Sequence, residues 1–129
     1  MVNRFACAVA LLVTAVIHLA VVPEHAHEWL AAAVFFVGLA VVEVALACAV
    51  LARAHRHVLL IGSVISIASA ALWVASRTVG LPLGPEAFSP EAVAAPDLLA
   101  TALEIFVAAA FIRLAAPTPS AGVSAHAYQ

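Results

Sequence analysis

Apolar positions along the chain gather into four long runs that are separated by short polar breaks. The runs cover approximately residues 5–22, 29–52, 58–76 and 97–116. Each is close to the ~20 residues that an α-helix needs to cross the hydrocarbon core of a bilayer. The pattern therefore predicts four transmembrane helices.

The breaks between the runs predict how these helices connect. Pro23 stands in the first break, a basic turn (RAHRH, 53–57) forms the second, and a proline- and glycine-rich segment covers 77–97. Prolines and glycines in the last segment exclude a continuous helix there. Short first and second connections make successive helices antiparallel, so we expect an all-α up-down four-helix bundle. The polar, Pro-containing segment 117–129 is expected to be a disordered tail.

Composition places this bundle in a membrane. Hydrophobic residues make up 67% of the chain and charged residues 9%, and the mean hydropathy is +1.18. A water-soluble domain of 129 residues cannot bury so large an apolar fraction. The net charge of −2 and the absence of lysine exclude nucleic acid as a partner, because phosphate binding needs clustered cations. The expected partners are lipid, other membrane protein subunits or a second copy of the chain.

The arginines predict the orientation of the bundle in the plasma membrane. With four spans, Arg4, Arg53, Arg56 and Arg113 fall on one side, and Arg77 falls on the other. By the positive-inside rule, both termini and the tail are cytoplasmic. The first polar break and the 77–97 segment then share the outer face.

Histidines and carboxylates concentrate around the first break, in the stretch IHLAVVPEHAHEW. His18 lies one turn below the expected outer end of the first helix, and His25 and Glu28 follow at i+7 and i+10. All three share one helical face if the helix continues past Pro23. Alternatively, Pro23 starts the second helix, and Glu24 and Glu28 complement its positive end.

The fourth run carries two carboxylates, Asp97 and Glu104, at i and i+7, and Glu104 is expected at a depth comparable with His18. Imidazole and carboxylate ligands from facing helices can hold zinc, copper, iron or manganese. The sequence therefore indicates a divalent transition-metal site at the outer face, with His27 as a further possible ligand. Its candidate ligands are His18, His25, Glu28, Asp97 and Glu104.

Two further charged residues fall within or beside the apolar runs. Arg77 is expected to form a structural ion pair with Asp97 or Glu104, because an unpaired guanidinium beside hydrocarbon is costly. Glu43 stands apart, towards the cytoplasmic half of the second helix. It could be one step of a proton path, although a structural or subunit-contact role is the favoured interpretation.

Four motifs of the chain occur together: H-x6-H-x2-E-W (18–29), Phe35 and Phe36 with Gly38, R-x2-G-x-P-x-G-P-E (77–86) and D-L-L-x3-L-E (97–104). With these motifs the chain resembles small uncharacterised four-span membrane proteins of actinobacteria and halophilic archaea. The resemblance covers most of the spans but not the tail. It implies the same four-span topology and draws attention to the same polar positions, and it implies no activity.

The sequence favours an accessory or structural subunit of a larger membrane complex, because the chain is small and has no soluble domain. A divalent-metal-binding membrane protein is the first alternative, and a proton- or ion-conducting element is the second. No catalytic motif is present, so an enzyme is the less favoured class.

Overall fold

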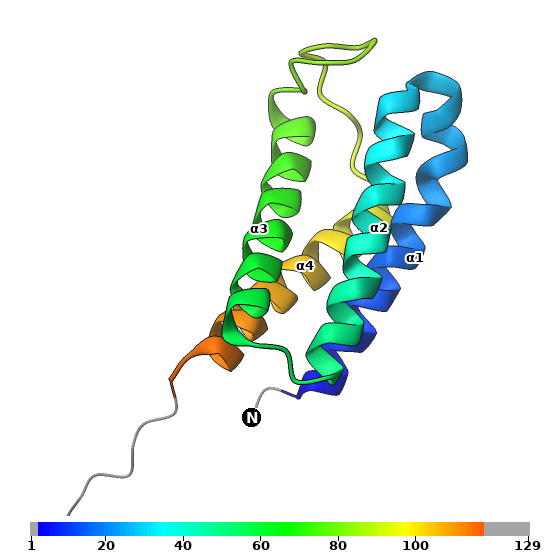
Figure 1. Cartoon of the computed structure of the whole chain (residues 1–129). Helices are drawn as coiled ribbons and strands as arrows, with labels where there is room; N and C mark the ends of the chain where they lie inside the picture. The colour runs from blue at the N-terminus through cyan, green and yellow to red at the C-terminus, as the bar shows by residue number, and fades with distance from the viewer. Residues whose placement is uncertain (1–2, 118–129) are drawn as a thin grey trace, which may run out of the picture.

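The computed structural model describes residues 3–117, which form four helices and no strand. The helices are α1 (Arg4–Glu28), α2 (Leu30–Leu51), α3 (Arg56–Thr78) and α4 (Ala95–Ala115). Each is long and apolar enough to cross a membrane (Figure 1). The predicted all-α class and the four candidate spans are confirmed. The expected tail lies, after Pro117, outside the described residues.

The first helix is longer than the apolar run predicts. α1 continues through Pro23 to Glu28, although the run ends near Val22. Proline removes only its own amide hydrogen, so a helix can pass through it while the other backbone groups keep their partners. Trp29 ends α1 in an extended conformation, and its amide donates to the His25 carbonyl at 2.7 Å. The alternative in which Pro23 starts the second helix is wrong, because α2 begins at Leu30.

The four helices pack as two pairs. α1 lies beside α2, and α3 packs on α4, which crosses behind the other helices in Figure 1. The pairs meet mainly through α1 and α4, whereas α2 and α3 touch little. The start of α1, the 52–55 turn and the end of α4 lie at one end of the molecule, which we call the basic end. The Trp29 turn and the 79–94 loop lie at the opposite end, the loop end.

A tightly packed apolar core fills the basic half of the bundle. Phe111 and Val50 are fully buried, and Leu11, Leu46 and Leu59 are nearly so. The approach of α3 to α4 is close, since a Cβ atom added to Gly62 would lie 2.7 Å from a Phe111 ring carbon. The Ser63 hydroxyl also donates to the Ala108 carbonyl at 3.0 Å. Small residues thus allow close helix packing, as is common between membrane helices.

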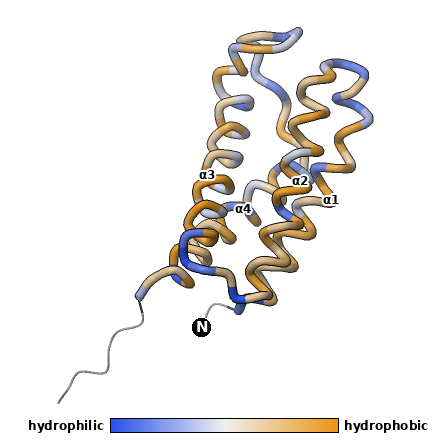
Figure 2. The backbone as a smooth tube through the Cα atoms, in the orientation of Figure 1, coloured by the Kyte–Doolittle hydropathy of each residue, from blue (hydrophilic) through white to orange (hydrophobic). Residues whose placement is uncertain are grey.

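The outward faces of the helices are apolar over most of their length. Figure 2 shows hydrophilic residues gathered at the two ends, in the turns between α1 and α2 and between α2 and α3. Between the ends, large side chains such as Val16, Val34 and Ile61 are at least 60% exposed. An apolar surface of this extent is unfavourable in water and suits contact with a lipid bilayer.

The 79–94 loop folds back towards the turn between α1 and α2. Gly80 and Gly84 adopt positive φ values of 72° and 98°, which side chains with a Cβ rarely adopt. Gly84 lies against the Trp29 ring, so the loop reaches the turn between α1 and α2. The Glu91 amide donates to the Ser76 carbonyl at 3.0 Å and fixes the return of the loop to α3.

Candidate functional site: a buried histidine and two glutamates

His18 is the residue on α1 around which the site is built. It lies one turn beyond Thr14, and only 6% of its surface is exposed. The Thr14 hydroxyl donates to the Ala10 carbonyl at 2.8 Å and is satisfied within its own helix. The His18 imidazole instead faces carboxylates on two other helices.

Glu43 on α2 is the first of these carboxylates. Its Oε2 lies 3.0 Å from His18 Nδ1, and the residue is 3% exposed. The expectation that Glu43 stands apart from the outer polar residues is therefore wrong. Because α1 continues to Glu28, His18 is ten residues, about 15 Å, from the loop end of its helix. Glu43 is thirteen residues, about 20 Å, from the start of α2, a difference that the two side chains span.

Glu104 on α4 is the second carboxylate, and it too is 3% exposed. Its Oε1 lies 3.9 Å from His18 Nε2 and has no hydrogen-bond partner among the described residues. Thr101 is buried one turn earlier on the same helix, and Ser69 of α3 lies beside the Glu104 carboxylate. A buried carboxylate oxygen without a partner is costly, so this atom marks a place where a cation or a proton is expected.

His18, Glu43 and Glu104 together form what we call the His18 cluster. One ligand atom from each residue lies within 4.8 Å of the other two, and this is the one such group among residues 3–117. Three helices contribute one residue each. A neutral imidazole between two carboxylates can bind a divalent cation, whereas a protonated imidazole can share protons with them.

The other ligands expected at the first break do not join this cluster. His25 is half-buried, and its Nδ1 lies 2.8 Å from the Val21 carbonyl of the preceding turn. His27 and Glu28 are exposed in the last turn of α1. The i, i+7 spacing places His25 on the His18 side of α1, but it also separates the two residues by about 10 Å along the axis.

Asp97 belongs to a separate ion pair at the loop end. Arg77 Nη2 lies 2.7 Å from Asp97 Oδ2, and Arg77 Nη1 contacts a Glu91 carboxylate oxygen of the loop. The Arg77 guanidinium carbon also lies 5.7 Å from the centre of the Trp73 ring. Of the two partners expected for Arg77, the structure pairs it with Asp97, and Glu104 faces His18 instead.

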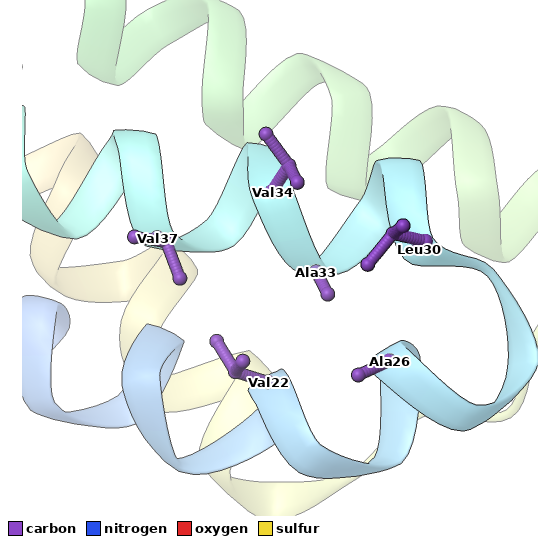
Figure 3. Close-up of a pocket in the computed structure, with 6 residues that line it drawn as sticks. All are labelled: Val22, Ala26, Leu30, Ala33, Val34 and Val37. Carbon is purple, nitrogen blue, oxygen red and sulfur yellow. The ribbon is translucent and has the colours of Figure 1, made fainter.

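An apolar recess lies between the loop ends of α1 and α2 (Figure 3). Its volume is about 270 Å³. The recess presents almost no polar surface, so it is not part of the His18 cluster. Its lining residues are Val22, Ala26, Leu30, Ala33, Val34 and Val37.

One signal in the sequence could have identified Glu43 as a member of the cluster. The residues that follow Pro23 include no second helix breaker before Trp29, so a helix to that point was compatible with the sequence. Counting depth back from Trp29, rather than from Val22, places His18 and Glu43 near the same level.

The chain thus combines four helices able to cross a membrane with a buried His/Glu cluster, and it is consistent with a multi-pass membrane protein. Comparison with protein-family models, with curated proteins and with solved structures gives no significant match.

Proposed function

We propose that the chain is a multi-pass protein of the plasma membrane that binds one divalent transition-metal ion between His18, Glu43 and Glu104. The observation that supports this most is the convergence of three ligand atoms within 4.8 Å in a buried site. Ionisable side chains are rare within membrane helices and usually mark a functional site.

Charge balance supports a divalent cation in particular. Two ionised glutamates and a neutral imidazole carry a charge of −2, which a divalent ion neutralises. In a low-dielectric interior an uncompensated carboxylate is costly, so the cluster needs either such an ion or two added protons. Binding of a divalent metal ion accounts for both glutamates and for the unpartnered Oε1 of Glu104.

The ligand atoms must move closer together to bind one ion, since they lie within 4.8 Å of one another. In a tetrahedral site with ligands at 2.0–2.2 Å, neighbouring ligand atoms are about 3.3–3.6 Å apart. His18 Nε2 and Glu104 Oε1 are separated by 3.9 Å, so a few tenths of an ångström must close. Glu43 either completes the ligand set or accepts the Nδ1–H of His18 and orients the ring, a common arrangement at metal sites. One imidazole with carboxylates suits zinc, iron or manganese, and copper(II) less well.

Conduction through the bundle is supported less well than binding. A proton or ion path needs polar groups in both halves of the bundle. The basic half below the cluster is filled mainly by apolar side chains, including Leu11, Val50 and Phe111, that are at most 2% exposed. The buried hydroxyls there, of Thr14 and Ser63, donate to backbone carbonyls. An accessory-subunit role remains compatible with the site, since the same three residues could simply tie three helices together.

Metal analysis of the detergent-purified chain tests the proposal. The protein, purified without chelator and then supplied with zinc, iron(II), manganese(II) or copper(II), is expected to retain about one ion per chain. His18→Gln and Glu104→Gln should lose it while the helical content is unchanged, because each removes a ligand. His25→Gln is the matched control, since it changes a histidine of the same helix outside the cluster, and it should retain the ion.

Two results would count against metal binding. If wild-type protein retains none of the four metals, the cluster is a hydrogen-bonded network and the accessory-subunit function takes the place of metal binding. Equal metal loss in His25→Gln and His18→Gln would place the site elsewhere.

The proposal includes an up-down arrangement with both termini in the cytoplasm. Four arginines at the basic end and one at the loop end support this orientation. In intact cells, an impermeant thiol reagent should label a cysteine introduced at Ala87, in the 79–94 loop, and not one introduced at Ala54. The opposite labelling pattern would reverse the orientation.

A further inference from the structure

One aromatic ring separates the His18 cluster from the loop end. Phe36 of α2 contacts both His18 and His25, with ring centroids 5.5 Å and 4.6 Å away. The two histidines are seven residues apart on α1, which corresponds to a rise of about 10 Å. Contact with both imidazoles places the Phe36 ring at a level between them.

The two sides of this ring differ in their exposure. His18 is buried, whereas His25 is half-buried in the last turns of α1 and lies close to the exposed His27 and Glu28. Towards the basic end, the His18 cluster borders the apolar core. The shortest polar approach to His18 along α1 therefore starts at His25 and is interrupted by Phe36.

We propose that Phe36 is a gate on the α1–α2 side of the His18 cluster, and that ions and protons pass between His18 and His25 when this ring moves aside. His25 stands on the loop-end side of the gate, in contact with the ring. The gate explains why three ionisable groups can stay dry although the half of the bundle around them contains polar residues. The identity of the gated ion rests on the proposed function, but the gate itself does not.

Chemical modification of His18 tests the gate without using metal binding. The full-length chain in detergent, stripped of metal by a chelator, is treated with diethyl pyrocarbonate. The rate at each histidine is followed by fragment-ion mass spectrometry. In wild-type protein, His25 and His27 should react fast and His18 slowly. Phe36→Ala should accelerate His18 by about tenfold or more, because a buried group reacts through the open state of its local structure.

Phe35→Ala is the matched control, since Phe35 neighbours Phe36 on α2 and is 44% exposed. It should leave the His18 rate within about twofold of wild type, because removing an exposed side chain opens no path to a buried group. If Phe36→Ala does not fold, Phe36→Val gives a smaller opening. The rate of His18 modification in Phe36→Val should still exceed the rate in Phe35→Ala. Equal His18 rates in wild type and the Phe36 variants, or equal acceleration by Phe35→Ala, would overturn the gate.

The metal experiment separates this inference from the proposed function. Phe36→Ala should retain the same metal stoichiometry as wild type and release the ion to a chelator faster. Retained metal with an unchanged His18 modification rate would refute the gate and leave the metal site standing. Accelerated modification of His18 in a chain that binds no metal would support the gate and remove the proposed ion.

Discussion

The two halves of the bundle use the same helices for different purposes. In the basic half, the four helices meet in an apolar core around Phe111. The packing there is so close that a Cβ atom added to Gly62 would lie 2.7 Å from the Phe111 ring. The part that we call the loop half runs from the middle of the bundle to the loop end. It holds the His18 cluster at mid-bundle, the Arg77 ion pairs and an apolar recess between α1 and α2.

The two halves are held together by different interactions. Lipid tails are as apolar as the core residues, so the basic half is held mainly by close packing rather than by transfer of side chains from water. The loop half carries charged groups whose partners lie on different helices, and each unpaired group there would be costly. We therefore infer that the basic half supplies stability and the loop half supplies function.

The largest expected effect on stability is in the basic half. Phe111→Ala should lower the free energy of unfolding by about 3 kcal/mol, the low end for removal of a buried phenylalanine, because the membrane reference state is already apolar. Denaturation in mixed micelles measures it. Phe106→Ala, on the same helix but 44% exposed, is the control and should change stability by less than about 0.5 kcal/mol. Equal losses in both variants would show that the basic half is not closely packed.

An intermediate effect is expected from the ion pair at the loop end. Arg77→Ala should cost about 2 kcal/mol, because it removes a mostly buried guanidinium and leaves the Asp97 carboxylate unpaired. The 79–94 loop should also become more sensitive to protease, since Arg77 contacts Glu91 within it. Arg56→Ala, at an exposed position, should cost less than about 0.5 kcal/mol. Unchanged stability in Arg77→Ala would indicate that the guanidinium merely extends to the interface.

A smaller effect is expected in the loop itself. Gly80→Ala should cost about 1 kcal/mol, because the residue has a positive φ and its Cβ would lie 2.5 Å from backbone atoms of Phe88 and Ser89. Gly38→Ala is the control, since a Cβ there meets no atom within 4 Å and alanine favours a helix. Thermal unfolding of both variants measures the difference. Similar midpoints would mean that the loop contributes nothing to the fold.

The fold could be predicted from the sequence because apolar runs of membrane-spanning length have few alternatives. The starts and ends of the helices followed the runs to within two residues, except at the end of α1. There the run stops near Val22 but the helix continues to Glu28. Hydropathy reports where a chain meets lipid, whereas a helix ends where its backbone hydrogen bonds end.

The unexpected length of α1 also limited the prediction of the site. His18 and Glu104 were identified because an ionisable residue in an apolar run stands out by itself. Glu43 was equally visible, and it does lie towards the basic end of α2. Its contact with His18 was missed because the expected first helix was too short, which put His18 too close to the loop end. Asp97 and His25 satisfy other groups, Arg77 and the Val21 carbonyl. The sequence offered Asp97 both to Arg77 and to the metal, and spacing alone could not decide between these two partners.

X-ray absorption spectroscopy of the metal-loaded chain tests the central claim most directly. The account predicts nitrogen and oxygen ligands at ~2.0–2.2 Å with scattering from a single imidazole, that of His18. It also predicts that this imidazole scattering disappears in any metal that His18→Gln still retains. Scattering from two or more imidazoles, or an unchanged spectrum in His18→Gln, would contradict the account, because the ion would then lie at His25 and His27 or between two chains.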